Sequence, residues 1–171
     1  QFSLNQHLQK RERLFRDHLA FDRVTQLVDA SYLRRLIAME QDRHSSVPNC
    51  VALLDINAFH VLNRDHGVEE GDRALQAVAH MLLLNLSSQD VLCRYAGDRF
   101  AIYMPATTIA LAQSKLDHLC KMVGQMHFYT QTQQVQITLR AVCSEAVEQL
   151  EDLLARLDPL DPVSMLSEET E

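Results

Sequence analysis

The sequence predicts an α/β domain in which helices cover a central sheet. Residues 50–56 form an unbroken apolar run, which is typical of a strand buried on both faces of a sheet. Residues 91–95 and 100–104 are two more strand-like runs, and the segment 96–99 between them contains a glycine and an aspartate, which predicts a β-hairpin. Apolar residues at helical spacing around these strands predict the helices that cover the sheet.

The expected helices share this spacing and lie at residues 4–19, 31–39, 59–65, 71–86, 108–124 and 145–157. Ser31 and one of the two threonines at 107–108 are the expected N-caps, and Gly67 is expected to end a helix. Residues 126–130 and 135–143 alternate enough to predict a second hairpin.

We expect one globular domain at residues 21–158, with an amphipathic lead-in helix at residues 1–20 and an acidic tail or linker at residues 159–171. The chain starts at Gln1 without a basic-then-apolar leader, so we expect a piece of a longer protein. The lead-in helix is expected either to pair with a second copy, which would give a homodimer, or to lie along the domain surface.

Composition excludes several classes of partner. The net charge of -7 argues against a nucleic-acid polymer, which usually requires a basic face, whereas mononucleotides remain allowed. The longest apolar runs are far shorter than the ~20 residues of a membrane span, so we expect no membrane contact by this segment. The four cysteines lack a Cys-x-x-Cys pair, which favours reduced thiols in a cytoplasmic domain, whose parent protein could be anchored to a membrane.

Three stretches carry a resemblance to a known family. They read Asp22-Arg23-Val24-Thr25-Gln26-Leu27, then Asp55-Ile56-Asn57-Ala58-Phe59-His60 followed by Asn63, Gly67 and Gly71-Asp72, and finally Arg94-Tyr95-Ala96-Gly97-Asp98-Arg99-Phe100. In order and spacing they resemble the GGDEF family of bacterial signalling domains, whose active members are diguanylate cyclases that join two GTP molecules into cyclic di-GMP. The resemblance implies a palm-like fold with a central, mostly antiparallel sheet flanked by helices.

The resemblance also implies a metal site. The family's ligands correspond here to Asp55, the backbone carbonyl of Ile56, and Asp98, and they imply a weak Mg²⁺ site. Arg99 stands where active members have a glutamate. Two unit charges ~4 Å apart interact with roughly 4 kcal/mol at an effective dielectric constant near 20, so an inward-pointing Arg99 is expected to prevent a two-metal site and leave Asp98 without its catalytic function. Arg99 is alternatively expected to reach the phosphates itself.

The nucleotide contacts are partly retained. Asn63 and Asp72 match the family residues that read guanine, and Phe59-His60 stands where the family has Phe-Lys. His60 is mostly neutral at pH 7, unlike the lysine that contacts phosphate in the family. The family's carboxy-terminal run of further cations has no counterpart in residues 156–160. The local alternatives are that Asp72 is an acid at a helix start and that Asn63 is a helix cap.

Two further sites are a product-inhibition site, which the resemblance implies, and a calcium-binding loop. The product-inhibition site of the family is Arg-x-x-Asp, and the chain reads Ser87-Ser88-Gln89-Asp90 there, so Asp90 is a vestige and we expect weak or no binding of cyclic di-GMP. A calcium loop beginning at Asp55 is disfavoured because Phe59 would occupy a ligand position and His60 the position of the required glycine.

These observations leave three functional hypotheses. The first is a degenerate regulatory domain that binds GTP and modulates a linked phosphodiesterase-type (EAL) or other output domain. The second is an interaction module that binds no nucleotide, and the third is a cyclase with residual activity. The retained Asn63 and Asp72 favour the first over the second, while Arg99 disfavours the third.

Overall fold

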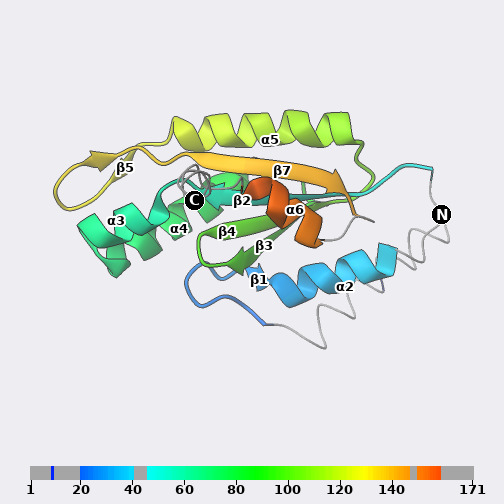
Figure 1. The fold of residues 1–171 in the computed structure, drawn as a ribbon, viewed down its shortest axis with the longest axis horizontal. Helices are drawn as coiled ribbons and strands as arrows, with labels where there is room; N and C mark the ends of the chain where they lie inside the picture. Colours follow the sequence, from blue (N-terminus) through cyan, green and yellow to red (C-terminus); the bar gives the residue numbers. More distant parts are fainter. Residues whose placement is uncertain (1–8, 10–19, 41–45, 147–149, 159–171) are drawn as a thin grey trace, which may run out of the picture.

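The computed structural model describes residues 9, 20–40, 46–146 and 150–158. Its helices are α2 (Ala30–Glu40), α3 (Phe59–His66), α4 (Val68–Leu84), α5 (Ile109–Gly124) and α6 (Leu150–Leu157). Its strands are β1 (Val28–Asp29), β2 (Cys50–Ile56), β3 (Val91–Ala96), β4 (Arg99–Met104), β5 (Phe128–Tyr129), β6 (Gln134–Val135) and β7 (Leu139–Glu145). Figure 1 shows how these elements follow one another along the chain.

The main sheet has five strands in the order β1-β3-β4-β2-β7. All neighbours in it are antiparallel except β1 and β3, which confirms the expected mostly antiparallel sheet. Every residue of β2 is buried, because β2 lies between β4 and β7 and both of its faces are covered. This central position is the physical reason for the unbroken apolar run at residues 50–56.

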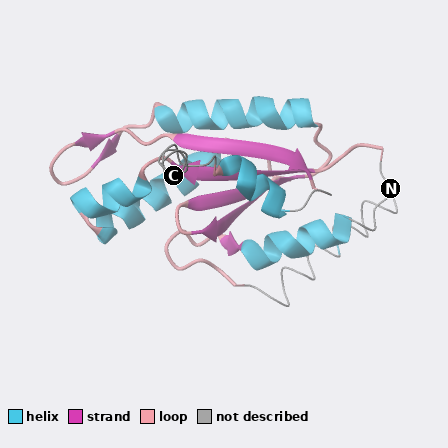
Figure 2. Ribbon diagram, viewed as in Figure 1, coloured by secondary structure: helices cyan, strands magenta, loops and turns pink. Residues whose placement is uncertain are grey.

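Helices cover both faces of the sheet (Figure 2). Along β2, Ala52 and Leu54 belong to the core cluster built with α4 and α5, whereas Val51 and Leu53 belong to the cluster built with α2 and α6. Successive side chains of a strand point to opposite faces, so Asp55 lies on the face of α2 and α6. Strand alternation alone therefore determines which face of the sheet carries the expected site residue of β2.

Two helices begin elsewhere than expected. Ser31 does not cap α2, because its backbone N and its Oγ donate to Oδ1 of Asp29, at 3.0 and 2.5 Å, and Asp29 precedes the helix. Helix α4 starts at Val68 and not near Gly71, since Gly67 with φ 90° both ends α3 and precedes α4. Asp72 consequently lies inside α4 and is not the acid at its start. The expected cap at 107–108 is Thr108, whose side chain accepts from Leu111 N at 3.3 Å.

The second hairpin is smaller than expected. Strands β5 and β6 pair only with each other in a separate two-stranded sheet, and β7 pairs with β2 along its whole length. A seven-residue strand finds a full-length, buried partner in β2, which the short β5 does not offer. The expected lead-in helix, except Gln9 and Ala20, and the tail at 159–171 lie outside the described residues. Among the helices that are described, none is long and apolar enough to cross a membrane.

Candidate functional site

The end of β2 and the tip of the β3–β4 hairpin lie side by side. The β2–β4 register places Asp55 opposite Arg99, and the backbone N of Ile56 donates to the carbonyl oxygen of Asp98 at 3.1 Å. The antiparallel pairing that buries β2 thus brings together all the residues expected at the metal site. Asp55 and Asp98 are distant in the sequence, and the register of the sheet is what brings them together.

Asp55 is held by an arginine from the other neighbouring strand. The β2–β7 register places Asp55 opposite Arg140, and Nη2 of Arg140 donates to Oδ2 of Asp55 at 2.7 Å. The side chain of Asp55 is 7% exposed and that of Arg140 is 45% exposed. Oδ1 of Asp55 is buried and has no hydrogen-bond partner within the described part of the chain. Asp55 therefore presents one engaged and one free oxygen.

The carboxyl group of Asp98 interacts with that of Asp55. Burial, a side-chain hydrogen bond with Asp55 and the negative charge of Asp55 raise the pKa of Asp98 to about 6. Desolvation and a neighbouring carboxylate both disfavour the ionised form.

Arg99 is turned toward α6. Its Nη2 lies 2.5 Å from both carboxylate oxygens of Asp158, the residue that follows α6. Because Arg99 is opposite Asp55 in the sheet, it shares the face of α2 and α6, and an acid at the end of α6 is within its reach. The arginine at the hairpin tip is thus engaged by a carboxylate outside the predicted site.

The residues present do not fit a two-metal site. One oxygen of Asp55 is engaged by Arg140, Arg99 stands where active family members have the hairpin glutamate, and burial and the charge of Asp55 raise the pKa of Asp98. Within the described ranges, no group of three His, Cys, Asp or Glu side chains is placed to hold a metal ion. Hard divalent cations need several oxygen ligands, and this site offers two free carboxylate groups at most.

The guanine-contacting candidates gather where α3 meets α4. Oδ1 of Asn63 is buried and has no hydrogen-bond partner among the described residues. A Cβ atom built on Gly71 would lie 1.7 Å from that oxygen and 3.3 Å from Cζ of Phe59, so Asn63 and Phe59 both contact the glycine closely. Asp72 follows Gly71 and is half-buried, whereas His60 is exposed. A buried amide oxygen without a partner costs free energy of folding, so the position of Asn63 calls for a functional explanation.

Asp90 is already engaged. Its Oδ2 accepts from Ser87 N at 3.0 Å and lies 3.1 Å from Nζ of Lys115, a residue of α5. The side chain of Asp90 is 2% exposed. A lysine from α5 therefore neutralises Asp90, the residue expected to be a vestige of the family's product-inhibition site.

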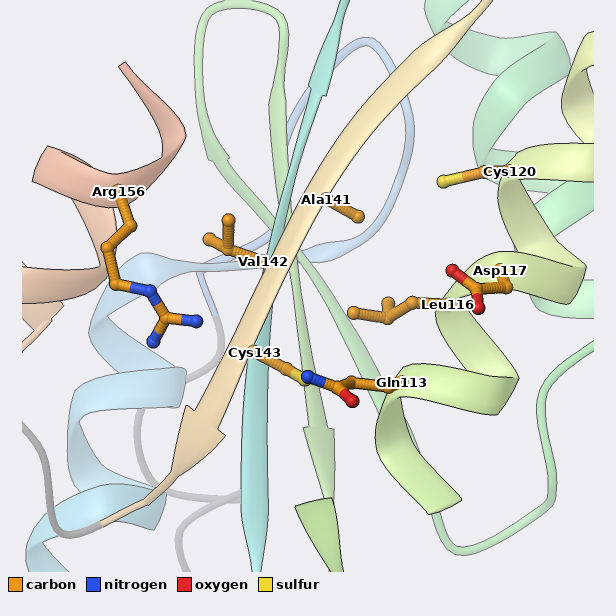
Figure 3. A pocket seen from close by; sticks show the side chains of 8 residues that line it. All are labelled: Gln113, Leu116, Asp117, Cys120, Ala141, Val142, Cys143 and Arg156. Carbon is orange, nitrogen blue, oxygen red and sulfur yellow. The ribbon is translucent and has the colours of Figure 1, made fainter. Parts of the chain in front are cut away.

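A pocket of about 490 Å³ lies beside β7, away from these residues. Figure 3 shows Asp117 on α5 and Arg156 on α6 on opposite sides of the strand, with Cys143 between them. Burial raises the pKa of Cys120 and of Cys143, so both thiols stay protonated and unreactive. All four cysteines are free thiols, as expected.

Three engaged residues were not anticipated from the sequence: Arg140, Lys115 and Asp158. Arg140 carries a usable signal, because it is a charged residue within the alternating run that forms β7. Lys115 is a half-buried residue of α5 and Asp158 an exposed residue just after α6, and neither carries a comparable signal.

A family model and several curated proteins match this chain in sequence. The family model "Diguanylate cyclase, GGDEF domain" matches residues 19–159. Diguanylate cyclase DgcP of Pseudomonas aeruginosa is 30% identical over 91 residues, which is 53% of this chain and 14% of that protein. Uncharacterized protein YtrP of Bacillus subtilis is 31% identical over 110 residues, covering 64% of this chain and 18% of that protein. The chain spans less than a fifth of either relative.

Solved structures share the fold. The GGDEF domain of FimX from Pseudomonas aeruginosa superposes with a TM-score of 0.72 at 24% identity, over 82% of this chain and 90% of that one. Diguanylate cyclase SiaD of the same organism, solved in complex with its activator SiaC, gives a TM-score of 0.75 at 19% identity, over 97% of this chain and 65% of that one. With the family model matching most of its length, the chain belongs to the GGDEF family of diguanylate cyclase-like domains of cyclic di-GMP signalling.

Proposed function

We propose that this chain is a regulatory GGDEF domain that binds GTP without converting it to cyclic di-GMP. The observation that carries the proposal is a contrast between the two halves of the site. In the guanine half, the buried oxygen of Asn63 has no hydrogen-bond partner among the described residues, whereas in the phosphate half Arg140 engages Asp55.

The guanine half supports nucleotide binding. Asn63 comes from α3 and Asp72 from α4, and the close approach of Asn63 to Gly71, the residue before Asp72, supports a shared role for the two side chains. An amide oxygen and a carboxylate accept hydrogen bonds, and the Watson–Crick edge of guanine offers N–H donors. Adenine presents a different donor pattern, so the same pair disfavours ATP.

The phosphate half argues against catalysis. A diguanylate cyclase must activate a ribose 3′-hydroxyl for in-line attack on an α-phosphate, and the protein's contribution to such reactions is positioning and neutralisation of charge. Bound Mg²⁺ supplies Lewis acidity in that reaction. Arg99 and Arg140 supply positive charge but no Lewis acidity, and Asp55 and Asp98 are the residues left to hold a weakly bound Mg²⁺ ion.

We assign the regulatory role to the domain at residues 21–158, which would act on a linked output domain or on a second copy of the chain. The Arg99–Asp158 ion pair joins the hairpin tip to the end of α6. GTP binding at the site would therefore be transmitted to the end of α6. A linked EAL phosphodiesterase-type domain is the proposed receiver of this change, and the lead-in helix is the proposed route to a homodimer. The engaged Asp90 supports weak or no binding of cyclic di-GMP.

Titration calorimetry with GTP and ATP at fixed Mg²⁺ tests the proposal. We expect GTP to bind more tightly than ATP, and Asp72→Ala to lower the GTP affinity about tenfold or more, because a buried polar group left unpaired costs ~1–3 kcal/mol. Asp152→Ala, which removes an exposed carboxylate on α6, is the matched control and should change neither affinity. Equal millimolar affinities for GTP and ATP that ignore Asp72→Ala would favour the nucleotide-free interaction module.

A further inference from the structure

The neighbour of Asp55 on β7 has no role in the resemblance described above. We propose that Arg140 is a tethered cation that keeps a divalent metal ion from Asp55, so that two arginines and not one disable the metal site. This inference rests on the proposed function and specifies which residues close its phosphate half. Its consequence is that restoring the hairpin glutamate at position 99 is not sufficient to restore metal binding.

The contact between Arg140 and Asp55 is built into the sheet. The two residues are direct partners in the β2–β7 register, on strands that pair over their full lengths. The guanidinium donates to Oδ2 of Asp55 at 2.7 Å, and the aspartate side chain is 93% buried, since only 7% is exposed. A charge-assisted hydrogen bond to a buried carboxylate is strong, and neither partner can leave without exposing an unpaired charge.

This contact opposes a metal ion in two ways. It engages one of the two oxygens through which Asp55 would coordinate a cation. It also places a permanent positive charge beside the position of the ion, because a guanidinium does not lose its proton in proteins. A divalent ion experiences twice the repulsion of a monovalent one at the same distance.

Arg99 is the less direct obstacle. Its guanidinium is neutralised by Asp158 at 2.5 Å, so its charge is partly compensated outside the predicted site. Arg99→Glu would add a carboxylate, but that carboxylate would face Asp158 and would leave Arg140 on Asp55. Arg140→Ser instead frees Oδ2 of Asp55 next to its unpartnered Oδ1.

Mn²⁺ binding without nucleotide tests the inference, measured by electron paramagnetic resonance on the whole chain. We compare the wild type, Arg99→Glu, Arg140→Ser and the double variant. We expect the wild type and Arg99→Glu to bind in the millimolar range or weaker, Arg140→Ser to bind at least about tenfold more tightly, and the double variant most tightly. Arg64→Ser is the control, because Arg64 is exposed and pairs with Asp65 away from the site.

Arg140→Gln guards against loss of the fold, since glutamine keeps a hydrogen-bond donor but removes the charge. Mn²⁺ should raise the Tm of Arg140→Gln and leave the Tm of Arg64→Gln unchanged. Folded Arg140 variants that bind Mn²⁺ no better than the wild type would overturn the inference, as would Arg99→Glu binding as tightly as the double variant. Because GTP is absent from these assays, a failure of GTP binding is observed separately.

Discussion

Arg94 donates from Nη1 to Oδ2 of Asp22 at 2.9 Å, and its Nε donates to the carbonyl oxygen of Gly97 at 2.8 Å. Asp22 also accepts hydrogen bonds from the backbone N and the hydroxyl of Thr25. One guanidinium therefore ties the turn that precedes β1 to the turn that carries Asp98. The position of the hairpin tip depends on a residue far upstream in the chain.

Removing this guanidinium should destabilise the domain. The side chains of Arg94 and Asp22 are only 13% and 22% exposed, so Arg94→Ala leaves a partly buried carboxylate without its counter-charge. We expect a loss of about 2 kcal/mol in the free energy of unfolding. Arg64→Ala, which removes an exposed pair, should change it by less than about 0.5 kcal/mol. Urea denaturation monitored by circular dichroism compares the two, and equal losses would contradict the assigned role of Arg94.

Elements with a strong local pattern were predictable from the sequence. Strand β2, the β3–β4 hairpin and α5 each carry their own signal in the form of an apolar run, a turn residue pair or a cap with helical periodicity. The division of residues 126–145 into β5, β6 and β7 was not predictable, because β7 is defined by pairing with β2, which is distant in sequence. The start of α4 was placed too late because Gly67 serves both as the end of α3 and as the start of the next helix.

The residues of the candidate site also divide into those that were predictable from the sequence and those that were not. Asp55 and Asp98 were expected together because the resemblance assigns both to one site, and the β2–β4 register brings them together. Arg140 was missed because its role exists only through the β2–β7 register. Lys115 and Asp158 were missed because a charged residue on or just after a helix gives no sign of which distant charge it meets.

The raised pKa of Asp98 predicts that this residue favours the folded state more at acidic pH than at neutral pH. With the pKa of Asp98 at about 6 in the folded chain and at its ordinary value of 3.8 in the unfolded one, the folded state binds more protons between these values. The free energy of unfolding contributed by Asp98 therefore falls as the pH rises from about 4 to 6. Because Asp98 is half-buried and screened by water, we expect about 1 kcal/mol.

Asp98→Asn isolates this contribution. The variant should be more stable than the wild type by about 1 kcal/mol at pH 7 and should lose that advantage near pH 4. Taking the difference between the two proteins cancels groups such as Asp22, whose pKa is lowered and which therefore act in the opposite direction. Urea denaturation at several pH values measures it, with Asp152→Asn as the control. A difference that does not depend on pH would refute the interaction between Asp98 and Asp55.

Purified protein incubated with GTP and Mg²⁺ or Mn²⁺ should yield no cyclic di-GMP. The reason is that Arg140 engages Asp55 and that Arg99 replaces the hairpin carboxylate, so charge that develops on the phosphates is not met by a metal ion. Chromatography of the reaction mixture detects the product. Steady accumulation at micromolar enzyme would establish a residual cyclase.

Cyclic di-GMP should bind more weakly than the low micromolar range. Ser87→Arg recreates the family's Arg-x-x-Asp pattern, yet Asp90 remains paired with Lys115 at 3.1 Å, so the single variant should gain little. Ser87→Arg combined with Lys115→Ala frees the aspartate for the ligand and should bind at least about tenfold more tightly than the wild type. Calorimetry measures both, and low-micromolar binding by the wild type would count against the vestigial reading of Asp90.

Gly71→Ala should separate guanine recognition from folding. The added Cβ atom would lie 1.7 Å from Oδ1 and 2.9 Å from Cγ of Asn63, so the amide must rotate out of the contact between α3 and α4. Alanine favours a helix over glycine by about 1 kcal/mol, which offsets the cost of that movement, and we expect a folded protein of nearly unchanged stability. GTP affinity should nevertheless fall about tenfold or more, because the amide no longer meets the base edge.

Gly124→Ala is the matched control for this prediction. Gly124 ends α5, and apart from its chain neighbours and the backbone of its own helix no atom of the described residues lies within 4 Å of its added Cβ. That variant should be at least as stable as the wild type and should keep its GTP affinity. Thermal unfolding and calorimetry on the two variants supply the comparison. If Gly71→Ala stays folded and binds GTP as the wild type does, Asn63 does not read the nucleotide, and guanine recognition must be assigned to other residues.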